Sequence, residues 1–134
     1  MKTRSGIHFG LLICTTIFFL AGCMSPSEEF IQGVWYYDEK HLHSFIAEQQ
    51  LEIYWTFDGG QFAYDACCFN IDEHATGQYR VLDVTEDTIT IETYNSKGGN
   101  FKHEGTYTIK IDRENDTIKI QGGGGPYYRV SPKN

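Results

Sequence analysis

Polar and apolar residues alternate over most of the chain after residue 50. The odd positions of segment 51–57 are all apolar, and segments 88–92, 106–112 and 117–121 alternate in the same way. Strict alternation in segments rich in Thr, Ile, Tyr and Phe is typical of strands with one buried face. The pattern predicts eight strands, which we place at residues 33–37, 51–57, 61–68, 77–84, 88–94, 104–112, 116–121 and 126–130.

Turn sequences separate these strands and indicate how they connect. Asp58-Gly59-Gly60 is typical of a tight hairpin, and residues 85–87 and 113–116 form further short polar links. Regular short strands joined by hairpins predict an all-β fold, a single small antiparallel up-and-down barrel of about eight strands, with a β-sandwich as the alternative. Closure removes exposed strand edges, and eight strands enclose just enough room for side chains or one small ligand.

One segment follows a helical period instead. Leu42, Phe45 and Ile46 stand at positions i, i+3 and i+4 within segment 38–50. This spacing favours one or two amphipathic helical turns after the first strand. A strand extension or a loop is the alternative.

The first 22 residues have the pattern of a targeting signal. Lys2 and Arg4 form a basic start, residues 7–20 are mostly apolar, and Leu20-Ala21-Gly22-Cys23 follows at once. This order is typical of a secretory signal, and the apolar run is shorter than the ~20 residues of a membrane span. The segment resembles a bacterial lipoprotein signal peptide with residues 20–23 as its lipobox. An ordinary secretory signal or a transmembrane anchor is the alternative.

This resemblance implies cleavage before Cys23, diacylglycerol on the Cys23 sulfur and a fatty acid such as palmitate on its new amino group. Two or three acyl chains anchor a protein stably to a membrane. Residues 23–29 are then the lipidated cysteine and a short polar tether, and residues 30–134 are the barrel domain. Because Met24 rather than Asp follows Cys23, the resemblance implies the outer membrane in a host with two membranes. In a host with one membrane it implies the outer face of the plasma membrane.

Four short motifs resemble those of a lipocalin-like (calycin-type) domain. The first strand opens with Gly33-Val34-Trp35, and the other motifs lie at residues 56–60, 76–81 and 127–130. The resemblance covers roughly residues 30–131 and implies that Gly33, Trp35 and Arg129 form a structural barrel end, with Arg129 stacked on Trp35. A full lipocalin is longer, so two interiors stay open for this barrel, a ligand cavity or a core filled by aromatic side chains.

Composition narrows the choice of partners. The 134 residues include 11 Lys+Arg and 18 Asp+Glu, a net charge of -7, which argues against nucleic acid and against electrostatic docking on anionic lipid. Aromatic residues make up 15% and concentrate on the predicted strands, which suits a pocket that holds its ligand by stacking and hydroxyl hydrogen bonds. Ordinary core filling or a protein-binding face is the alternative. The predicted ligand-binding residues are Trp55, Phe57, Phe62, Tyr64 and Tyr107.

Catalytic motifs are not found in the sequence. It contains no GxSxG elbow, no phosphate-binding P-loop and no GxGxxG. Asp72 and Glu73 fall in a predicted turn, where carboxylates are solvated, whereas Asp38, Asp65 and Glu92 lie in or near strands and could point inward. We therefore predict that the protein is not an enzyme and needs no cofactor.

Cys67 and Cys68 are adjacent on a predicted strand, where neighbouring side chains face opposite ways. Their Cα atoms are about 3.8 Å apart, less than the ~4.4 Å or more of a relaxed disulfide. The favoured interpretation is one buried thiol and one surface thiol, with a disulfide or a metal site left open. The histidines that could complete a metal site fall in predicted loops and are interpreted as solvated, so no metal is assigned: His41, His43, His74 and His103.

Taken together, these patterns predict a lipid-anchored binding protein of the cell envelope, outside the cytoplasm, which holds a small apolar or amphipathic ligand in its barrel. Its predicted partners are the membrane, through the lipid anchor at Cys23, and a small hydrophobic ligand or an envelope protein. The alternative is a protein-interaction or envelope-accessory module whose core is filled and which binds no ligand.

Overall fold

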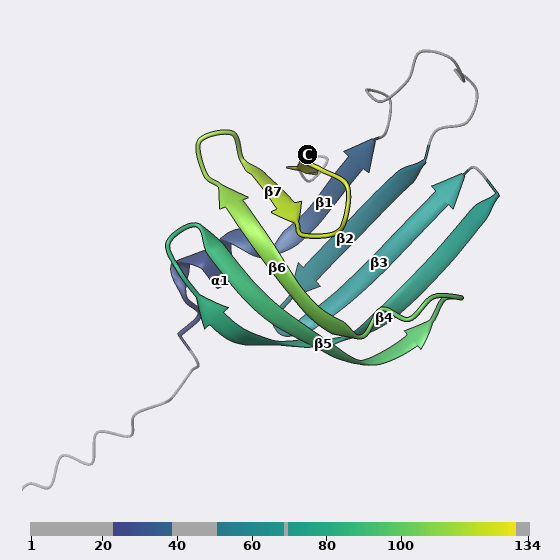
Figure 1. Cartoon of the computed structure of the whole chain (residues 1–134), viewed down its shortest axis with the longest axis horizontal. Coiled ribbons are helices and arrows are strands. Elements are labelled where there is room, and N and C mark those ends of the chain that lie inside the picture. The colour runs from purple at the N-terminus through teal and green to yellow at the C-terminus, as the bar shows by residue number, and fades with distance from the viewer. Residues whose placement is uncertain (1–22, 39–50, 69, 131–134) are drawn as a thin grey trace, which may run out of the picture.

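The structure is a computed structural model that describes residues 23–38, 51–68 and 70–130. Within these residues the chain forms one short helix and eight strands (Figure 1). In chain order they are α1 (Pro26–Ile31), β1 (Gly33–Asp38), β2 (Glu52–Asp58), β3 (Gln61–Cys68), β4 (Ile71–Val84), β5 (Thr88–Gly98), β6 (Gly105–Asp112), β7 (Thr117–Ile120) and β8 (Tyr127–Arg129).

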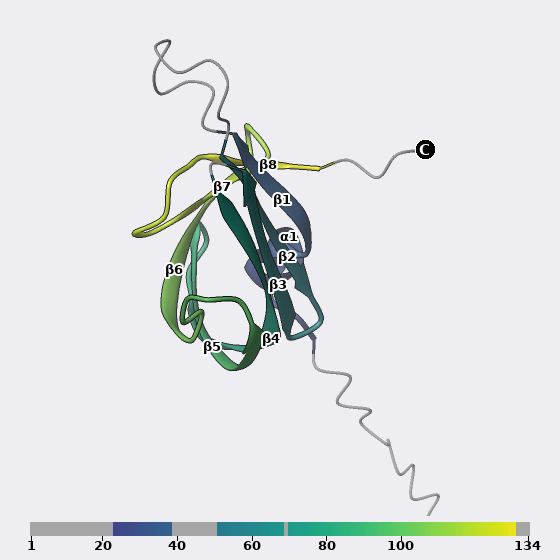
Figure 2. The same ribbon diagram turned by 90° about the vertical axis from the view of Figure 1, so that its right-hand side faces the viewer.

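The strands form one closed antiparallel barrel. Each strand pairs with the next along the chain, and β8 pairs with β1 to close the ring. Figure 2 shows β5 and β6 on one side of the interior and β1, β2 and β3 on the other. The predicted up-and-down barrel of eight strands is therefore confirmed, and the sandwich alternative is excluded.

Each predicted strand is present, and two extend at least four residues beyond their predicted bounds. β4 begins at residue 71 rather than 77, and β5 continues to residue 98 rather than 94. The added part of β4 places a charged residue, Glu73, at an inward position. A charged residue at this position interrupts the alternation of polar and apolar residues. For this reason a turn rather than a strand was predicted at residues 72 and 73.

The barrel interior holds the apolar side chains of the alternating pattern. The largest buried side chains include Trp35, Phe57, Ile91, Ile109 and Tyr127, which come from five different strands. Burying each side chain of this size contributes about 1.5–3 kcal/mol of hydrophobic free energy. The outward positions between them are polar or partly exposed, as the period of two predicts.

Helix α1 forms within the segment predicted to be a polar tether. Ser25 caps its N-terminus by accepting a hydrogen bond from the Glu28 N–H at 3.1 Å. Ser27 is buried, and its hydroxyl donates to the Thr85 carbonyl oxygen at 2.9 Å. Residues 26–29 are therefore part of the folded domain rather than of a tether.

Trp35 and Arg129 join α1 to the barrel. The buried Trp35 indole N–H donates to the Ile31 carbonyl oxygen at 2.7 Å. The Arg129 guanidinium lies 4.2 Å from the centroid of the Trp35 ring and donates to the carbonyl oxygens of Gln32 and Phe30 at 2.7 and 2.8 Å. The predicted contact between Arg129 and Trp35 is confirmed.

Gly33 gives this guanidinium its room. Its φ of +114° lies in the region that L side chains rarely adopt, and a Cβ there would lie 3.3 Å from Arg129 Nη1. Glycine at this position therefore relieves backbone strain and leaves the Arg129 side chain its path to the Gln32 carbonyl.

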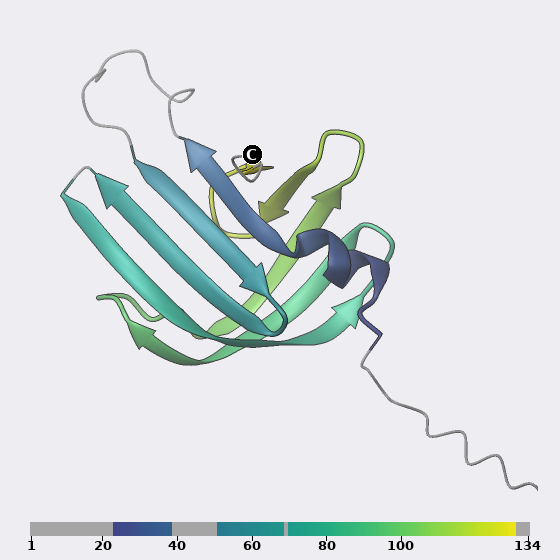
Figure 3. The same cartoon turned by 180° about the vertical axis from the view of Figure 1, so that it is seen from behind.

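The barrel has two different ends, which Figures 1 and 3 show from opposite sides. We call the end that carries α1, Trp35 and Arg129 the α1 end. We call the opposite end the distal end; it carries the last residues of β3, the first residues of β4 and the segment that joins β5 to β6. Of the residues discussed below, Glu73 and His103 lie near the distal end, whereas Phe57 stands opposite Gly33 beside α1.

Several of the predicted features lie outside the described residues. This applies to the predicted signal segment 1–22, to the predicted helix after β1 beyond residue 38, and to His41 and His43. Across the described ranges, α1 precedes β1, and no helix there combines the length and the apolar character needed to cross a membrane.

Candidate functional site

The barrel brings the five predicted ligand-binding residues together around the Trp55 ring. Its centroid lies 4.9 Å from that of Tyr64 and 5.5 Å from that of Tyr107, both at steep angles. Phe57 is stacked on it at 5.8 Å, and Phe62 lies at 6.0 Å. Because Trp55 stands on β2 and Tyr107 on β6, this cluster spans the interior between strands that are not neighbours.

Burial in this aromatic cluster changes with depth. Trp55, Phe57 and Phe62 are buried, whereas Tyr64 and Tyr107 are partly exposed. Burial raises the pKa of both tyrosine hydroxyls, so they stay protonated and remain hydrogen-bond donors at neutral pH. The deep part of the cluster is filled by its own rings, and the two tyrosines are the aromatic surface that an outside molecule can reach.

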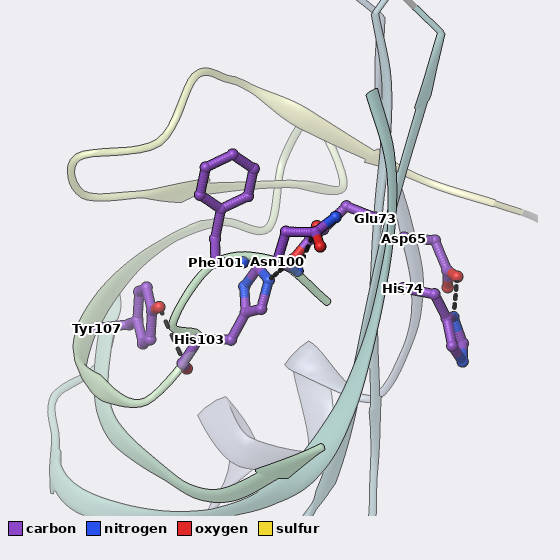
Figure 4. Close-up of polar contacts among 7 residues, drawn as sticks. All are labelled: Asp65, Glu73, His74, Asn100, Phe101, His103 and Tyr107. Atoms are coloured by element: carbon purple, nitrogen blue, oxygen red, sulfur yellow. Dashed lines mark hydrogen bonds and ion pairs between the residues drawn. The ribbon is translucent and has the colours of Figure 1, made fainter. Parts of the chain in front are cut away.

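A buried carboxylate lies beside the cluster (Figure 4). Glu73 on β4 points inward and is only 2% exposed. It accepts hydrogen bonds from the backbone N–H of Asn100 at 2.8 Å and of Phe101 at 3.0 Å, and from His103 Nε2 at 2.9 Å. These backbone donors lower the pKa of Glu73 to about 2, with a smaller contribution from His103. The carboxylate is therefore ionised at neutral pH.

The hydrogen bonds of Glu73 join β4 to the segment between β5 and β6, which folds over the barrel interior. His103 in this segment is 7% exposed, and its ring lies 4.5 Å from that of Tyr64. Thr93 fixes its backbone, because the Thr93 hydroxyl donates to the His103 carbonyl oxygen at 2.6 Å. Tyr107 donates to the same carbonyl at 3.3 Å. The segment thus covers the aromatic cluster with a histidine held in one orientation.

Sequence reasoning placed both members of this pair in solvent, and both placements are wrong. Glu73 belongs to a longer β4, and its side chain has the same inward parity as those of Ala75 and Tyr79. His103 lies outside the strands but folds back over the interior. The sequence signal for an inward Glu73 is its odd-numbered position, which it shares with Ala75 and Tyr79. This signal applies only when β4 is extended to residue 71.

Other carboxylates considered in the sequence face the outer surface. Asp65 pairs with His74 there, as Figure 4 shows, and Glu92 pairs with Arg80. The possibility that Asp65 and Glu92 point into the barrel is therefore wrong. The side chain of Asp38 lies outside the described part of the structure.

Cys67 and Cys68 place their sulfurs on the same side of β3. Cys68 has a φ of 81°, which turns its side chain away from the direction that a regular strand would give it. The two Sγ atoms lie 2.7 Å apart as free thiols, and Cys67 Sγ lies 3.7 Å from Glu52 Oε2. The prediction that the two side chains face opposite ways is wrong.

The surroundings of Cys67 favour its protonated form. The hydrogen bond to Cys68 raises the pKa of the Cys67 thiol to about 11, with further contributions from burial and from the negative charge of Glu52. Cys67 is partly buried and Cys68 is exposed. The Cys67 thiol is therefore not poised as a nucleophile.

The outer surface also carries an open groove of about 900 Å³ over β2, β3, β4 and β5. Most of the side chains that line it are polar, among them Thr56, Gln61, Thr76, Gln78 and Lys97. The groove brings together none of the predicted ligand-binding rings except that of Phe62, whose side chain is buried beneath it.

Comparisons with models of known protein families, with curated proteins and with solved structures find no match to this chain.

Proposed function

We propose that the protein is a lipid-anchored binding protein of the cell envelope, resembling bacterial lipoproteins with a lipocalin-like domain. In this proposal the barrel takes up a small apolar or amphipathic molecule near its distal end. The observation that supports it is the arrangement of Tyr64 and Tyr107, two partly exposed rings that rest on the buried ring of Trp55.

The filled depth of the cluster defines where a ligand would bind. Trp55 is packed against Phe57 and Phe62, so a ligand rests on the outer tyrosine rings rather than in the centre of the barrel. Tyrosine rings offer a flat apolar surface for stacking together with a hydroxyl at the rim. This combination selects a molecule with an apolar body and at least one hydrogen-bonding group.

The segment that covers the cluster adds an apolar contact at the surface. Phe101 in this segment is 65% exposed, although its backbone N–H is held by Glu73. A large apolar side chain that is held in water by a fixed backbone is available to a ligand. Figure 4 shows Phe101, His103 and Tyr107 on one side of Glu73, with Asp65 and His74 on the other.

The lipid anchor is supported by the position of Cys23 next to α1. Cys23 is exposed and stands two residues before the helix cap Ser25. Acyl chains on Cys23 would therefore hold the α1 end towards the membrane. The distal end, with its tyrosines, would face away from it.

Native mass spectrometry of residues 24–134, which contain α1 and all eight described strands, tests the binding proposal. The protein is purified from its own host without detergent. We expect a small-molecule adduct that is lost on denaturation and is lost in the Tyr107→Ala variant. Tyr128→Ala is the matched control, because Tyr128 is an exposed tyrosine on β8. An adduct-free wild type, or equal retention by both variants, contradicts the proposal and favours the interaction module with a filled core.

The anchor is tested separately by metabolic labelling with an alkyne analogue of palmitate. We expect the wild type to take up the label and to sediment with membranes, and the Cys23→Ser variant to do neither. Cys14→Ser is the matched control, because it changes another cysteine of the N-terminal segment outside the lipobox. Equal labelling of the two variants would show that Cys23 is not the acylated residue.

A further inference from the structure

Three possible metal ligands meet on the outer surface near the distal end. The antiparallel register of β2 and β3 sets Glu52 opposite Cys67. The left-handed φ of Cys68 then turns a third ligand to the same side. One carboxylate oxygen and two sulfurs, from Glu52, Cys67 and Cys68, all lie within 4.8 Å of one another.

We propose that Glu52, Cys67 and Cys68 bind a divalent cation of the zinc and cadmium class. Two thiolates and one carboxylate are a ligand set for a soft or borderline cation, and a tetrahedral ion keeps its fourth position for water. Calcium and magnesium prefer oxygen ligands alone and are disfavoured by the two sulfurs. Binding replaces the two thiol protons with the cation, so each ion bound releases two protons to solvent.

The distances require a small adjustment at one position. A tetrahedral ion with bonds of about 2.3 Å to sulfur and about 2.1 Å to oxygen separates two sulfurs by roughly 3.7 Å and a sulfur from an oxygen by roughly 3.6 Å. The Cys67 Sγ to Glu52 Oε2 distance is already 3.7 Å. The two sulfurs, at 2.7 Å, must separate by about 1 Å. Cys68 is exposed, so its side chain is free to rotate by this amount.

The charge around the cysteines favours a cation. Asp72 on β4 stands opposite Cys67 in the register, and Asp65 lies two residues earlier on the same face of β3. The Asp72 carboxylate adds to that of Glu52 in a protein whose net charge is -7, whereas Asp65 is paired with His74. A surface of one sign concentrates ions of the opposite sign. The negative charge of Glu52 and Asp72 therefore favours the approach of a cation to the two sulfurs.

Titration with Cd²⁺ tests this site, because thiolate coordination gives an ultraviolet charge-transfer band. The full chain is used with Cys14→Ser and Cys23→Ser as the common background, under a phosphine reductant, so that Cys67 and Cys68 are its remaining thiols. We expect one Cd²⁺ per chain, the charge-transfer band, and release of two protons per ion in weakly buffered solution. An intact far-ultraviolet circular dichroism spectrum shows that each variant used is folded.

Single substitutions distinguish the loss of a metal ligand from a general loss of negative charge. We expect Cys67→Ser and Cys68→Ser each to lose most of the band, and Glu52→Gln to weaken Cd²⁺ binding by about 10-fold or more. Glu92→Gln is the matched control, since it removes the same charge from an outer carboxylate on β5 that pairs with Arg80. Absence of the band in the background protein overturns the proposal. Equal weakening by Glu52→Gln and Glu92→Gln overturns the role of Glu52 as a ligand.

Discussion

Gly77 provides a sharp test of how tightly the aromatic cluster is packed. It stands on β4 opposite Phe62 on β3, and Phe62 contacts Trp55. A Cβ on Gly77 would lie 2.6 Å from Phe62 Cε1 and 3.0 Å from the Tyr94 carbonyl oxygen. The φ of Gly77 is outside the region that L side chains avoid, so the ring contact decides the effect of Gly77→Ala.

The size of the effect follows from these distances. Ordinary Cβ contacts begin at 3.4 Å, so the Phe62 edge must withdraw by 3.4 − 2.6 = 0.8 Å. Its retreat is blocked by Trp55, whose ring centroid is 6.0 Å away. Overpacking of this kind costs about 1–3 kcal/mol. We expect a loss of ~2 kcal/mol, and thermal unfolding of residues 24–134 should then show a Tm lower by about 9 °C.

Two further variants make the test specific. Gly123→Ala is the matched control, because its nearest heavy atoms would lie 3.5 Å away and its φ is also unrestricted; we expect it to change stability by less than ~0.5 kcal/mol. Phe62→Leu in the Gly77→Ala background removes the ring edge that clashes, so the double variant should be less destabilised than the sum of the single variants. Equal stability of Gly77→Ala and Gly123→Ala, or full additivity with Phe62→Leu, would refute this account of the packing.

Three other predictions concern the two ends of the barrel. The pKa of Glu73 is lowered to about 2 from its ordinary 4.5, so the stability that its carboxylate contributes is present above pH 4.5 and is lost as the pH falls toward 2. In urea unfolding, the Glu73→Gln variant should lose this part of the pH dependence. An unchanged pH profile would contradict the role of the Glu73 carboxylate. Arg129→Lys removes a guanidinium that donates to two carbonyls and stacks on an indole, so it should destabilise the fold by about 2 kcal/mol. The control is Arg80→Lys at an exposed arginine that pairs with Glu92, which should cost less than ~0.5 kcal/mol in the same denaturation assay. Ser27→Ala removes the hydrogen bond to the Thr85 carbonyl and should cost about 1 kcal/mol, with faster amide exchange in α1, and unaltered exchange would show that this bond does not hold the helix.

Much of the barrel was predictable because alternation is a local property of the sequence. The strands that follow it, such as β2 and β6, begin and end within one residue of their predicted bounds. The start of β4 was missed because its inward position 73 is charged and is neutralised only by groups far along the chain. Helix α1 was missed for a similar reason. Its cap at Ser25 is a recognisable signal, but a helix of six residues is stable only through its packing on the barrel.

The candidate sites show the same division between local and distant information. Parity predicts that Trp55 and Tyr107 both face inward, whereas their contact requires the ring of strands to close. Glu73 and His103 are 30 residues apart, and no spacing rule joins them. The two sulfurs meet because one residue, Cys68, adopts a left-handed φ at the end of β3, and residue type alone does not reveal that choice.

The strand that closes the ring is also its shortest. β8 has three residues, and its register pairs are Trp35 with Arg129 and Tyr36 with Tyr128 on one side, and Thr117 with Tyr128 and Ile118 with Tyr127 on the other. Because so little backbone is paired along this seam, separation of β8 takes less free energy than unfolding of the whole domain, and its amide protons should exchange with solvent first. The Arg129 side chain is then the main side-chain link across this seam, because it donates hydrogen bonds to the carbonyl oxygens of Phe30 and Gln32, just before β1. When β8 detaches, the edges of β1 and β7 are exposed to water, and these are the two edges along which the β8 of a second copy would pair in a domain-swapped dimer.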